Sequence, residues 1–392
     1  MSRPRTFPVV LAGFTAFLDL YATQPLLPYL AWTYDASAFK ASLTVTAPTV
    51  AVALAAPFVG RLADRYGLRR VIVLSAFGLA ATSLAASTAS TLNQLIAWRF
   101  VQGLVTPGVF AVVIAYIHEE WPATQASGIT AAYVGGTVAG GFVGRALTGV
   151  VSASAGWPRA FILLSVLNVI AAALIAWLMP AERKHTSGAR HAPAGSWSKL
   201  LRNRELVATY FVGAGILFTN MAAFTYVTFY LAAPPFLLST AALGWLFVTY
   251  LLGAVVTPVT GRWIDRYGRR AAFLAACAMG LGAVLMTLAP SLAAILAGLA
   301  LLGTSVFITQ AAATSHVAAL VPRSRGLALG MYSTCYYAGG SFGGAAPALV
   351  WARAGWIGCV AFIVVVQVVM LSIVWMVWSD GGGQKTESFT GV

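Results

Sequence analysis

Charged residues are scarce in this sequence. They make up 9% of its 392 positions, while 59% of the positions are hydrophobic. An ordinary soluble domain has about 25% charged residues. A chain of the present composition cannot cover its own surface with polar groups, so lipid must be the solvent for much of it. The composition therefore excludes an ordinary soluble protein and predicts an integral membrane protein.

Cysteine and histidine are scarce as well. The three cysteines, Cys277, Cys335 and Cys359, fall within apolar segments, where they are most simply small packing residues. The four histidines and ten carboxylates do not cluster as metal ligands would, and no Gly-x-x-x-x-Gly-Lys-Ser/Thr loop occurs. We therefore expect no metal ion, no cofactor and no direct hydrolysis of ATP. The lack of a nucleophile–base constellation and of a sizeable soluble domain argues against an enzyme.

Long apolar runs, by contrast, are abundant. A helix of about 20 apolar residues crosses the hydrocarbon core of a membrane. The runs predict an all-α membrane protein with twelve spanning helices, at about 8–31, 41–61, 70–90, 92–117, 126–151, 158–179, 206–232, 240–262, 270–289, 291–317, 324–350 and 353–378.

Basic residues gather on one side of the predicted membrane. Nineteen of the 24 Lys and Arg residues lie in the N-terminus, the tail and the loops of that side, whereas the opposite loops hold only Lys40, Arg159 and Arg353. Positive charge marks the cytoplasmic side, so both termini are expected in the cytoplasm. The net charge of +14 then faces anionic lipid, and nucleic acid is not expected as a partner.

The longest polar stretch divides the helices into two groups of six. It covers residues 181–205 and is rich in Gly, Pro, Ser and basic residues, which is typical of a flexible cytoplasmic linker. Within it, residues 197–201 are predicted to form a short helix at the membrane surface. We therefore predict an N-terminal bundle over residues 1–180 and a C-terminal bundle over residues 206–392, which ends in a short polar tail.

The two groups repeat the same landmarks. GRLADRYGLRR at residues 60–70 returns as GRWIDRYGRR at 261–270, and YVGGTVAGGFVGR at 133–145 corresponds to YSTCYYAGGSFGG at 332–344. The nearly constant separation predicts a pseudo-symmetric pair of six-helix bundles. Because six is an even number, both copies enter the membrane from the same side, as in transporters that rock two bundles about a central site.

The repeated loop resembles a motif of the major facilitator superfamily. The residues that carry this resemblance are Gly60, Asp64, Arg65, Gly67 and Arg70 in the first copy and Gly261, Asp265, Arg266 and Gly268 in the second. Asp19, nine residues before Pro28, and the stretch WRFVQG at 98–103 resemble the helix-one and helix-four motifs of that family's drug–proton antiporters. The resemblance implies a monomeric transporter of a bacterial inner membrane that works by alternating access and uses a proton gradient.

The resemblance also implies a role for the two loop copies. In the family, the first copy is thought to latch the two bundles together in the outward-open state, and we carry this latch role over to Asp64 and Asp265. Arginines alone would be enough to set the topology. The repeated Gly and Asp residues exceed that need, because glycine permits a tight turn and a carboxylate can pair with Arg or cap a helix.

Helix five departs from the family pattern. Antiporters of the family have a motif like Gly-x-x-x-Gly-Pro-x-x-Gly-Gly, where this chain has Gly136, Gly140, Gly141, Gly144 and Arg145. The small-residue face that lets helices approach is kept, but the proline-dependent bend is not. Two interpretations of Arg145 stay open: its side chain snorkels to the periplasmic interface, or it serves as a gate or a contact for an anionic group at the cavity mouth.

Asp19 is the only acidic residue within a predicted span, and Arg99 lies at a similar depth in helix four. A charge near mid-membrane is costly unless it is paired or hydrated, so such residues are candidates for function. One interpretation is a structural ion pair between the two helices. The other is a proton switch in which Asp19 titrates, Arg99 tunes it and Gln102 is a hydrogen-bonding neighbour.

The family's substrate cavity is lined mainly by helices one, four, seven and ten. The residues expected to line it here are Tyr21, Gln24, Asn220, Phe224, Tyr226 and Gln310, with Tyr336 and Tyr337 from helix eleven. Such rings, amides and phenols suit a small amphipathic molecule that is neutral or weakly charged. The sequence thus predicts a proton-coupled exporter of drugs or sugar-like metabolites, with a proton symporter or facilitator importing a small nutrient as the alternative.

Overall fold

All regular structure in the described part of the chain is helical. The computed structural model describes residues 6–180, 197–321 and 325–379. Its elements are α1 (Thr6–Leu20), η1 (Gln24–Leu26), α2 (Leu27–Thr33), α3 (Ala38–Tyr66), α4 (Leu68–Ser87), α5 (Leu92–Val105), α6 (Pro107–Glu120), α7 (Ala123–Ala155), α8 (Trp157–Leu178), α9 (Trp197–Arg202), α10 (Arg204–Ala232), α11 (Thr240–Trp245), η2 (Leu246–Val248), α12 (Thr249–Tyr267), α13 (Arg269–Met286), α14 (Leu292–Leu320), α15 (Arg325–Ala345) and α16 (Ala348–Val377), where η marks a 3-10 turn.

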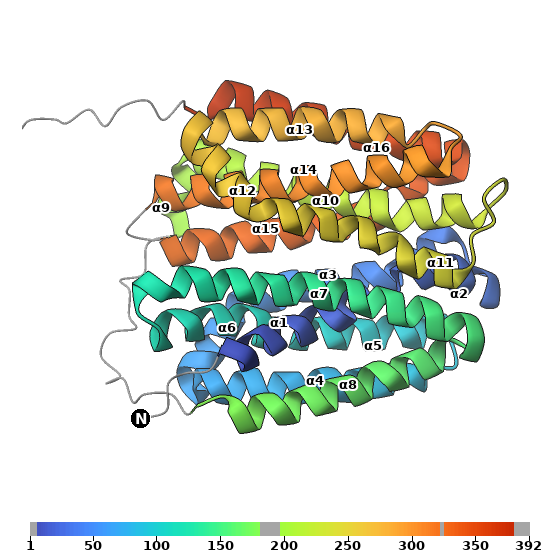
Figure 1. The fold of residues 1–392 in the computed structure, drawn as a ribbon, viewed down its shortest axis with the longest axis horizontal. Coiled ribbons are helices and arrows are strands. Elements are labelled where there is room, and N and C mark those ends of the chain that lie inside the picture. Colours follow the sequence, from blue (N-terminus) through green and yellow to red (C-terminus); the bar gives the residue numbers. More distant parts are fainter. Residues whose placement is uncertain (1–5, 181–196, 322–324, 380–392) are drawn as a thin grey trace, which may run out of the picture.

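The long helices lie side by side in two layers of the view in Figure 1. Helices α4 to α8 lie in the lower half, and α12 to α16 lie in the upper half. The short helix α9, in the part of the predicted linker that is described, packs through Leu200 against the core of the C-terminal helices. Most of the preceding linker, residues 181–196, falls outside the described residues.

Ten helical segments in the described residues are long and apolar enough to cross a membrane. They match ten of the predicted spans; the first combines α1, η1 and α2, and the fourth combines α5 and α6. Of the predicted span 240–262, the search for membrane spans covers only Thr240–Gly253, which is apolar but short. The predicted span 324–350 corresponds to α15, which is rich in Gly, Ser and Tyr and is not among the ten. Twelve crossings and cytoplasmic termini therefore stay predictions.

Glycines bring two pairs of long helices into backbone contact. A Cβ at Gly140 of α7 would lie 2.1 Å from the carbonyl oxygen of Phe14 in α1, and a Cβ at Gly339 of α15 would lie 2.1 Å from that of Ala214 in α10. The same approach to a carbonyl oxygen occurs at Gly136, Gly144 and Gly343. The repeat in the sequence is thus a repeat of helix packing, since no larger residue fits at these crossings.

Two glycines with positive φ end the helices at the repeated loops. Gly67 (φ 93°) follows α3 and Gly268 (φ 82°) follows α12, so that α4 and α13 begin at once. Other residues adopt this conformation only with strain. Beside these turns, Arg69 donates to carbonyl oxygens at the end of α8, and Arg270 donates to one at the end of α16. Cations are favourable there because a helix ends in partial negative charge.

The two groups of helices touch at the end of the molecule remote from these loops. Ser341 of α15 donates to the hydroxyl of Thr49 in α3 (3.1 Å), and Gln24 of η1 donates to the hydroxyl of Thr225 in α10 (3.4 Å). Helix α7 also packs against α11 at this end, on the right of Figure 1. We call it the closed end, and the end with the two loop copies the loop end.

The loop copies expected to form a latch are exposed in this conformation. The side chains of Asp64 and Arg65 face the surroundings, and a Cβ placed at Gly60 or Gly261 would have nothing within 4 Å. In this conformation, a side chain at either position would therefore meet no neighbouring atom, so close packing does not explain why glycine occurs at both. The side chain of Asp265 lies outside the described residues, and the latch role stays a prediction.

The substitution Gly140→Ala is expected to lower the free energy of unfolding by about 1–3 kcal/mol or to prevent folding, because the added methyl group would overlap the backbone of α1. Thermal unfolding in detergent would measure it. Gly135→Ala is the matched control, since a Cβ at Gly135 of the same helix has nothing within 4 Å. Equal unfolding temperatures for the two variants would contradict the close approach.

Candidate functional site

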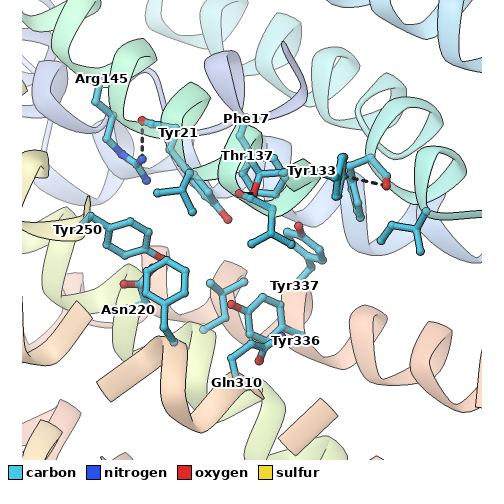
Figure 2. A pocket seen from close by; sticks show the side chains of 17 residues that line it. Phe17, Tyr21, Tyr133, Thr137, Arg145, Asn220, Tyr250, Gln310, Tyr336 and Tyr337 are labelled. Carbon is cyan, nitrogen blue, oxygen red and sulfur yellow. Dashed lines mark hydrogen bonds between the residues drawn. The ribbon is translucent and has the colours of Figure 1, made fainter. Parts of the chain in front are cut away.

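A cavity of about 290 Å³ lies between the two groups of helices (Figure 2). Residues of α1, α6 and α7 line one side, and residues of α10, α12, α14 and α15 line the other. Ligand sites in proteins begin at about 300 Å³ and are mostly apolar, so the size suits a small molecule. Nearly half of the lining residues are aromatic, namely Phe17, Tyr21, Phe110, Tyr133, Tyr250, Phe307, Tyr336 and Tyr337.

Five of the eight residues expected in a cavity do line it: Tyr21, Asn220, Gln310, Tyr336 and Tyr337. The other three do not. Phe224 packs against the rings of Phe247 and Tyr250 instead. The hydroxyl of Tyr226 donates to the carbonyl oxygen of Gly344 (2.9 Å), which fixes it in the helix packing. Gln24 lies behind the cavity wall, where it bonds to Arg145.

Several cavity residues, such as Tyr133, Phe110 and Tyr250, were not predicted. The hydroxyl of Tyr133 donates to the carbonyl oxygen of Phe110 (3.0 Å), and the hydroxyl of its repeat partner Tyr332 donates to Oε1 of Gln310 (2.6 Å). Phe110 and Gln310 stand at matching positions of the two halves. The repeat was therefore the signal that would have located Tyr133 and Phe110. Tyr250 carried no such signal.

Arg145 lies inside the protein, so the snorkelling interpretation is wrong for this conformation. Its side chain is 4% exposed; Nε donates to Oε1 of Gln24 (2.7 Å) and Nη1 to the carbonyl oxygen of Gly141 (2.7 Å). Helix α7 continues to Ala155, about 15 Å beyond Arg145 at 1.5 Å per residue, so the side chain starts well before the end of the helix. Its guanidinium carbon lies 4.7, 4.6 and 5.9 Å from the ring centroids of Tyr21, Phe247 and Tyr250.

The carboxylate of Asp19 is buried among helices of the N-terminal half and does not line the cavity. It accepts hydrogen bonds from Oγ of Ser83 in α4 (2.9 Å) and from Nδ2 of Asn168 in α8 (2.6 Å). Nε2 of Gln102 in α5 donates to the Ser83 hydroxyl (2.7 Å), so the expected neighbour acts through Ser83. Ser83 and Asn168 were not predicted, because nothing marks a single Ser or Asn in an apolar helix.

The guanidinium of Arg99 is fully buried too, but it contacts the backbone near Asp19 rather than the carboxylate. It donates to the carbonyl oxygens of Asp19 (2.8 Å), Leu20 (2.6 Å) and Thr44 (3.1 Å), and to the side chain of Gln102. In the described residues, no hydrogen bond or ion pair joins the two charged groups directly. The structural ion pair considered from the sequence is therefore not formed in this conformation.

A proline and a helix end explain why two of these carbonyl oxygens need a donor. Pro48 has no N–H group, so the carbonyl oxygen of Thr44, four residues earlier, loses its helical partner. Helix α1 ends at Leu20, whose carbonyl oxygen has no backbone partner among the described residues, while that of Asp19 also accepts from the N–H group of Ala22 (3.0 Å). Arg99 supplies both sets of oxygens with donors and so joins α1, α3 and α5.

The described residues contain no group of three or more His, Cys, Asp or Glu side chains that could hold a metal ion. Two features of the site are suited to chemistry or binding. One is a buried carboxylate, that of Asp19. The other is an aromatic cavity with a guanidinium at one end.

The substitution Arg99→Lys is expected to lower the free energy of unfolding by about 1–3 kcal/mol, because a single ammonium group cannot reach acceptors on three helices and leaves buried carbonyl groups unpaired. Thermal unfolding in detergent would measure the loss. Arg65→Lys changes an exposed guanidinium in the same way and should shift stability by no more than about 0.5 kcal/mol. Wild-type stability of Arg99→Lys would show that the backbone contacts are dispensable.

Comparison with known proteins places the chain in a family. Its residues 9–236 and 219–391 match the model of the Major Facilitator Superfamily. The MFS-type transporter YybF of Bacillus subtilis is 27% identical over 371 residues, which cover 94% of this chain and 92% of that protein. The inner membrane transport protein YnfM of Escherichia coli K12 is 28% identical over 365 residues, which cover 92% and 87%.

Solved structures share the fold. One is a bacterial homologue of the human lysosomal transporter Spinster in an inward-facing and occupied conformation, with a TM-score of 0.71 at 14% identity over 95% of this chain and 93% of that one. Another is the nucleoside transporter NupG, with a TM-score of 0.72 at 15% identity over 95% and 100%. The chain therefore belongs to the Major Facilitator Superfamily and is a multi-pass membrane transport protein, not an enzyme.

Proposed function

We propose that this transporter is a proton-coupled exporter of small amphipathic organic molecules, and that Asp19 takes up and releases the proton. The observation that carries the proposal is a fully buried carboxylate held by neutral donors, with no cation bonded to it directly among the described residues. A buried charge of this kind gains by neutralisation, because its transfer out of water is costly. The proton gradient then supplies the energy, and no cofactor is needed.

Asn168 is suited to both protonation states of Asp19. Its Nδ2 donates to the carboxylate, while its buried Oδ1 has no hydrogen-bond partner among the described residues. Half a turn of the amide would bring Oδ1 to Asp19, where it could accept a hydrogen bond from a protonated carboxyl group. The hydroxyl of Ser83 can likewise donate or accept. The surroundings of Asp19 can therefore follow the arrival and departure of a proton.

The segment that carries Asp19 also reaches the cavity. Tyr21, two residues later, lines the cavity, and Gln24 bonds both to Arg145 and to Thr225 of the opposite group of helices. Movement of this segment on protonation would act on the cavity and on the contacts at the closed end together. We propose this movement as the link between proton uptake and the alternating exposure of the cavity.

The setting we propose is a bacterial inner membrane, with the loop end in the cytoplasm and the closed end in the periplasm. The strong excess of Lys and Arg in the loops of the loop end supports this orientation. The monomer is the proposed functional unit, since the cavity is formed by two halves of one chain. Asp64 and Asp265 would join the halves at the loop end when the cavity opens to the periplasm.

A proton symporter or facilitator that imports a small nutrient is the second candidate. One observation favours it: α7 runs unbroken from Ala123 to Ala155, and Gly141 stands where the antiporter motif has proline. The bend on which the likeness to antiporters partly depends is therefore missing. The direction of flux under an imposed pH gradient separates the two candidates.

The substitution Asp19→Asn is expected to abolish flux driven by a pH gradient, because an amide does not take up the proton. Inverted membrane vesicles with an acidic interior would measure the flux across a panel of amphipathic compounds. Accumulation inside these vesicles indicates export, and proton-driven loss indicates symport. Asp35→Asn, the same change at an exposed position, should keep wild-type flux. Undiminished proton-driven flux in Asp19→Asn would remove this residue from the role.

The substitution Asp64→Ala is expected to slow transport and to raise the share of molecules in the conformation described here, because the latch would stabilise the opposite one. Distances between spin labels at the loop ends of α3 and α12 would report the two populations. Asp35→Asn, at an exposed position of the closed end, serves as the control, because Asn tolerates the positive φ of this residue (44°). Unchanged flux and an unchanged distance distribution would rule out a latch at Asp64.

A further inference from the structure

The cavity has an uncompensated positive charge. Among the described residues that line it, Arg145 alone is charged, and no Asp or Glu is present. The carboxylate of Asp19 does not neutralise it, because that side chain bonds to Ser83 and Asn168 inside the N-terminal half. The space between the bundles therefore carries the potential of one buried guanidinium.

Arg145 also has donors to spare. Its Nε–H and one N–H of Nη1 reach the neutral acceptors Gln24 and Gly141, while Nη2 has no acceptor among the described residues. The rings around it attract a cation but carry no counter-charge. Burying an unpaired ion is costly, so a charge held in this way calls for an anion or water. In membrane proteins such residues are sites of function by default.

The shape of the cavity separates a charged end from an aromatic end. Figure 2 shows Arg145 beside Tyr21 and Tyr250, with Asn220 next to Tyr250 and with Tyr133 and Tyr337 further along the cavity. A guanidinium presents parallel N–H groups that match the two oxygens of a carboxylate. Aromatic rings offer broad apolar surface for a flat molecule. The two ends together match a molecule with an anionic head and an apolar body.

We propose that the cavity binds an amphipathic organic monocarboxylate, with the carboxylate on the Nη groups of Arg145 and the apolar body among the aromatic side chains. This inference rests on the transport function proposed above and narrows its substrate class from neutral or weakly charged molecules to anions. The cavity of about 290 Å³ lies at the small end of the range of ligand sites in proteins. A ligand with one ring system and a short acidic arm suits this size.

Binding of an anion at Arg145 would change contacts between the two halves of the protein. The guanidinium of Arg145, on α7, contacts the rings of Phe247 and Tyr250 from the opposite half. A carboxylate drawn to the same guanidinium competes with these ring contacts near the closed end. The residue that recognises the anion thus also takes part in holding the halves together.

A charge series on one skeleton tests the proposal in the wild-type protein. Phenylacetate, phenylacetamide and phenethylamine carry a negative, a neutral and a positive group on the same ring. Calorimetry in detergent is expected to give at least about tenfold tighter binding of phenylacetate than of phenylacetamide, about 1.4 kcal/mol. Equal affinities, or tighter binding of the amine, would overturn the proposal. So would a failure of phenylacetate, benzoate and indoleacetate alike to bind.

Variants then assign the preference to Arg145. Arg145→Gln should bind phenylacetate and phenylacetamide equally, and Arg145→Lys should keep part of the preference for the anion. Full preference in Arg145→Gln would contradict the assignment. If that variant does not fold, the wild-type series still decides the substrate class.

The Asp19→Asn variant distinguishes this inference from the proposed function. It should keep the preference for phenylacetate over phenylacetamide, because Arg145 and not Asp19 recognises the charge of the ligand. An anion preference together with undiminished proton-driven flux in Asp19→Asn would leave the monocarboxylate site standing and refute the proton role. Loss of proton-driven flux in Asp19→Asn without any anion preference in the wild type would support the proton role of Asp19 and refute the monocarboxylate site.

Discussion

The hydrogen bonds of the buried Arg99 guanidinium fix the C-terminal end of α1. The positions of Asp19 and of the cavity residue Tyr21 depend on this end. Pro48 interrupts the hydrogen-bond ladder of α3 and α1 ends at Leu20, and Arg99 supplies the carbonyl groups of Thr44 and Leu20 with donors. The end of α1 is thereby fixed. From this end, the Asp19 side chain enters the interior of the N-terminal half, while Tyr21 faces the cavity.

Arg145 shows how differently the same type of side chain can be used. Arg99 is surrounded by oxygen acceptors on several helices and has its hydrogen-bonding capacity largely met. Arg145 is equally hidden but lies mainly among rings, with N–H groups left over. Arg99 therefore stabilises the packing of the helices that it joins. Arg145 keeps donors that are open to a ligand.

The sequence predicted those features that follow from a repeated pattern. It did not predict side-chain contacts that depend on how distant helices pack. Apolar runs located the helices, and the loop motif with its echo predicted the family. The positions of Asp19 and Arg99 could be predicted because a charge in an apolar run is conspicuous. Ser83 and Asn168 could not, since their partners come from distant helices. Arg145 was placed too shallow because α7 is longer than its apolar run suggests, and Phe224 and Tyr226 turned out to pack within helix contacts.

The contacts at the closed end have a consequence for how the two halves separate. Ser341 with Thr49, and Gln24 with Thr225, are neutral hydrogen bonds, each worth about 0.5–1.5 kcal/mol net. The loop end, in contrast, exposes charged groups such as Asp64 and Arg65. Dissolved ions screen exposed charges over about 8 Å at physiological ionic strength but have little hold on buried neutral bonds. If Asp64 joins the halves at the loop end in the opposite conformation, as proposed, salt would weaken that contact more than the neutral bonds of the closed end, and ionic strength would shift the balance between the two conformations.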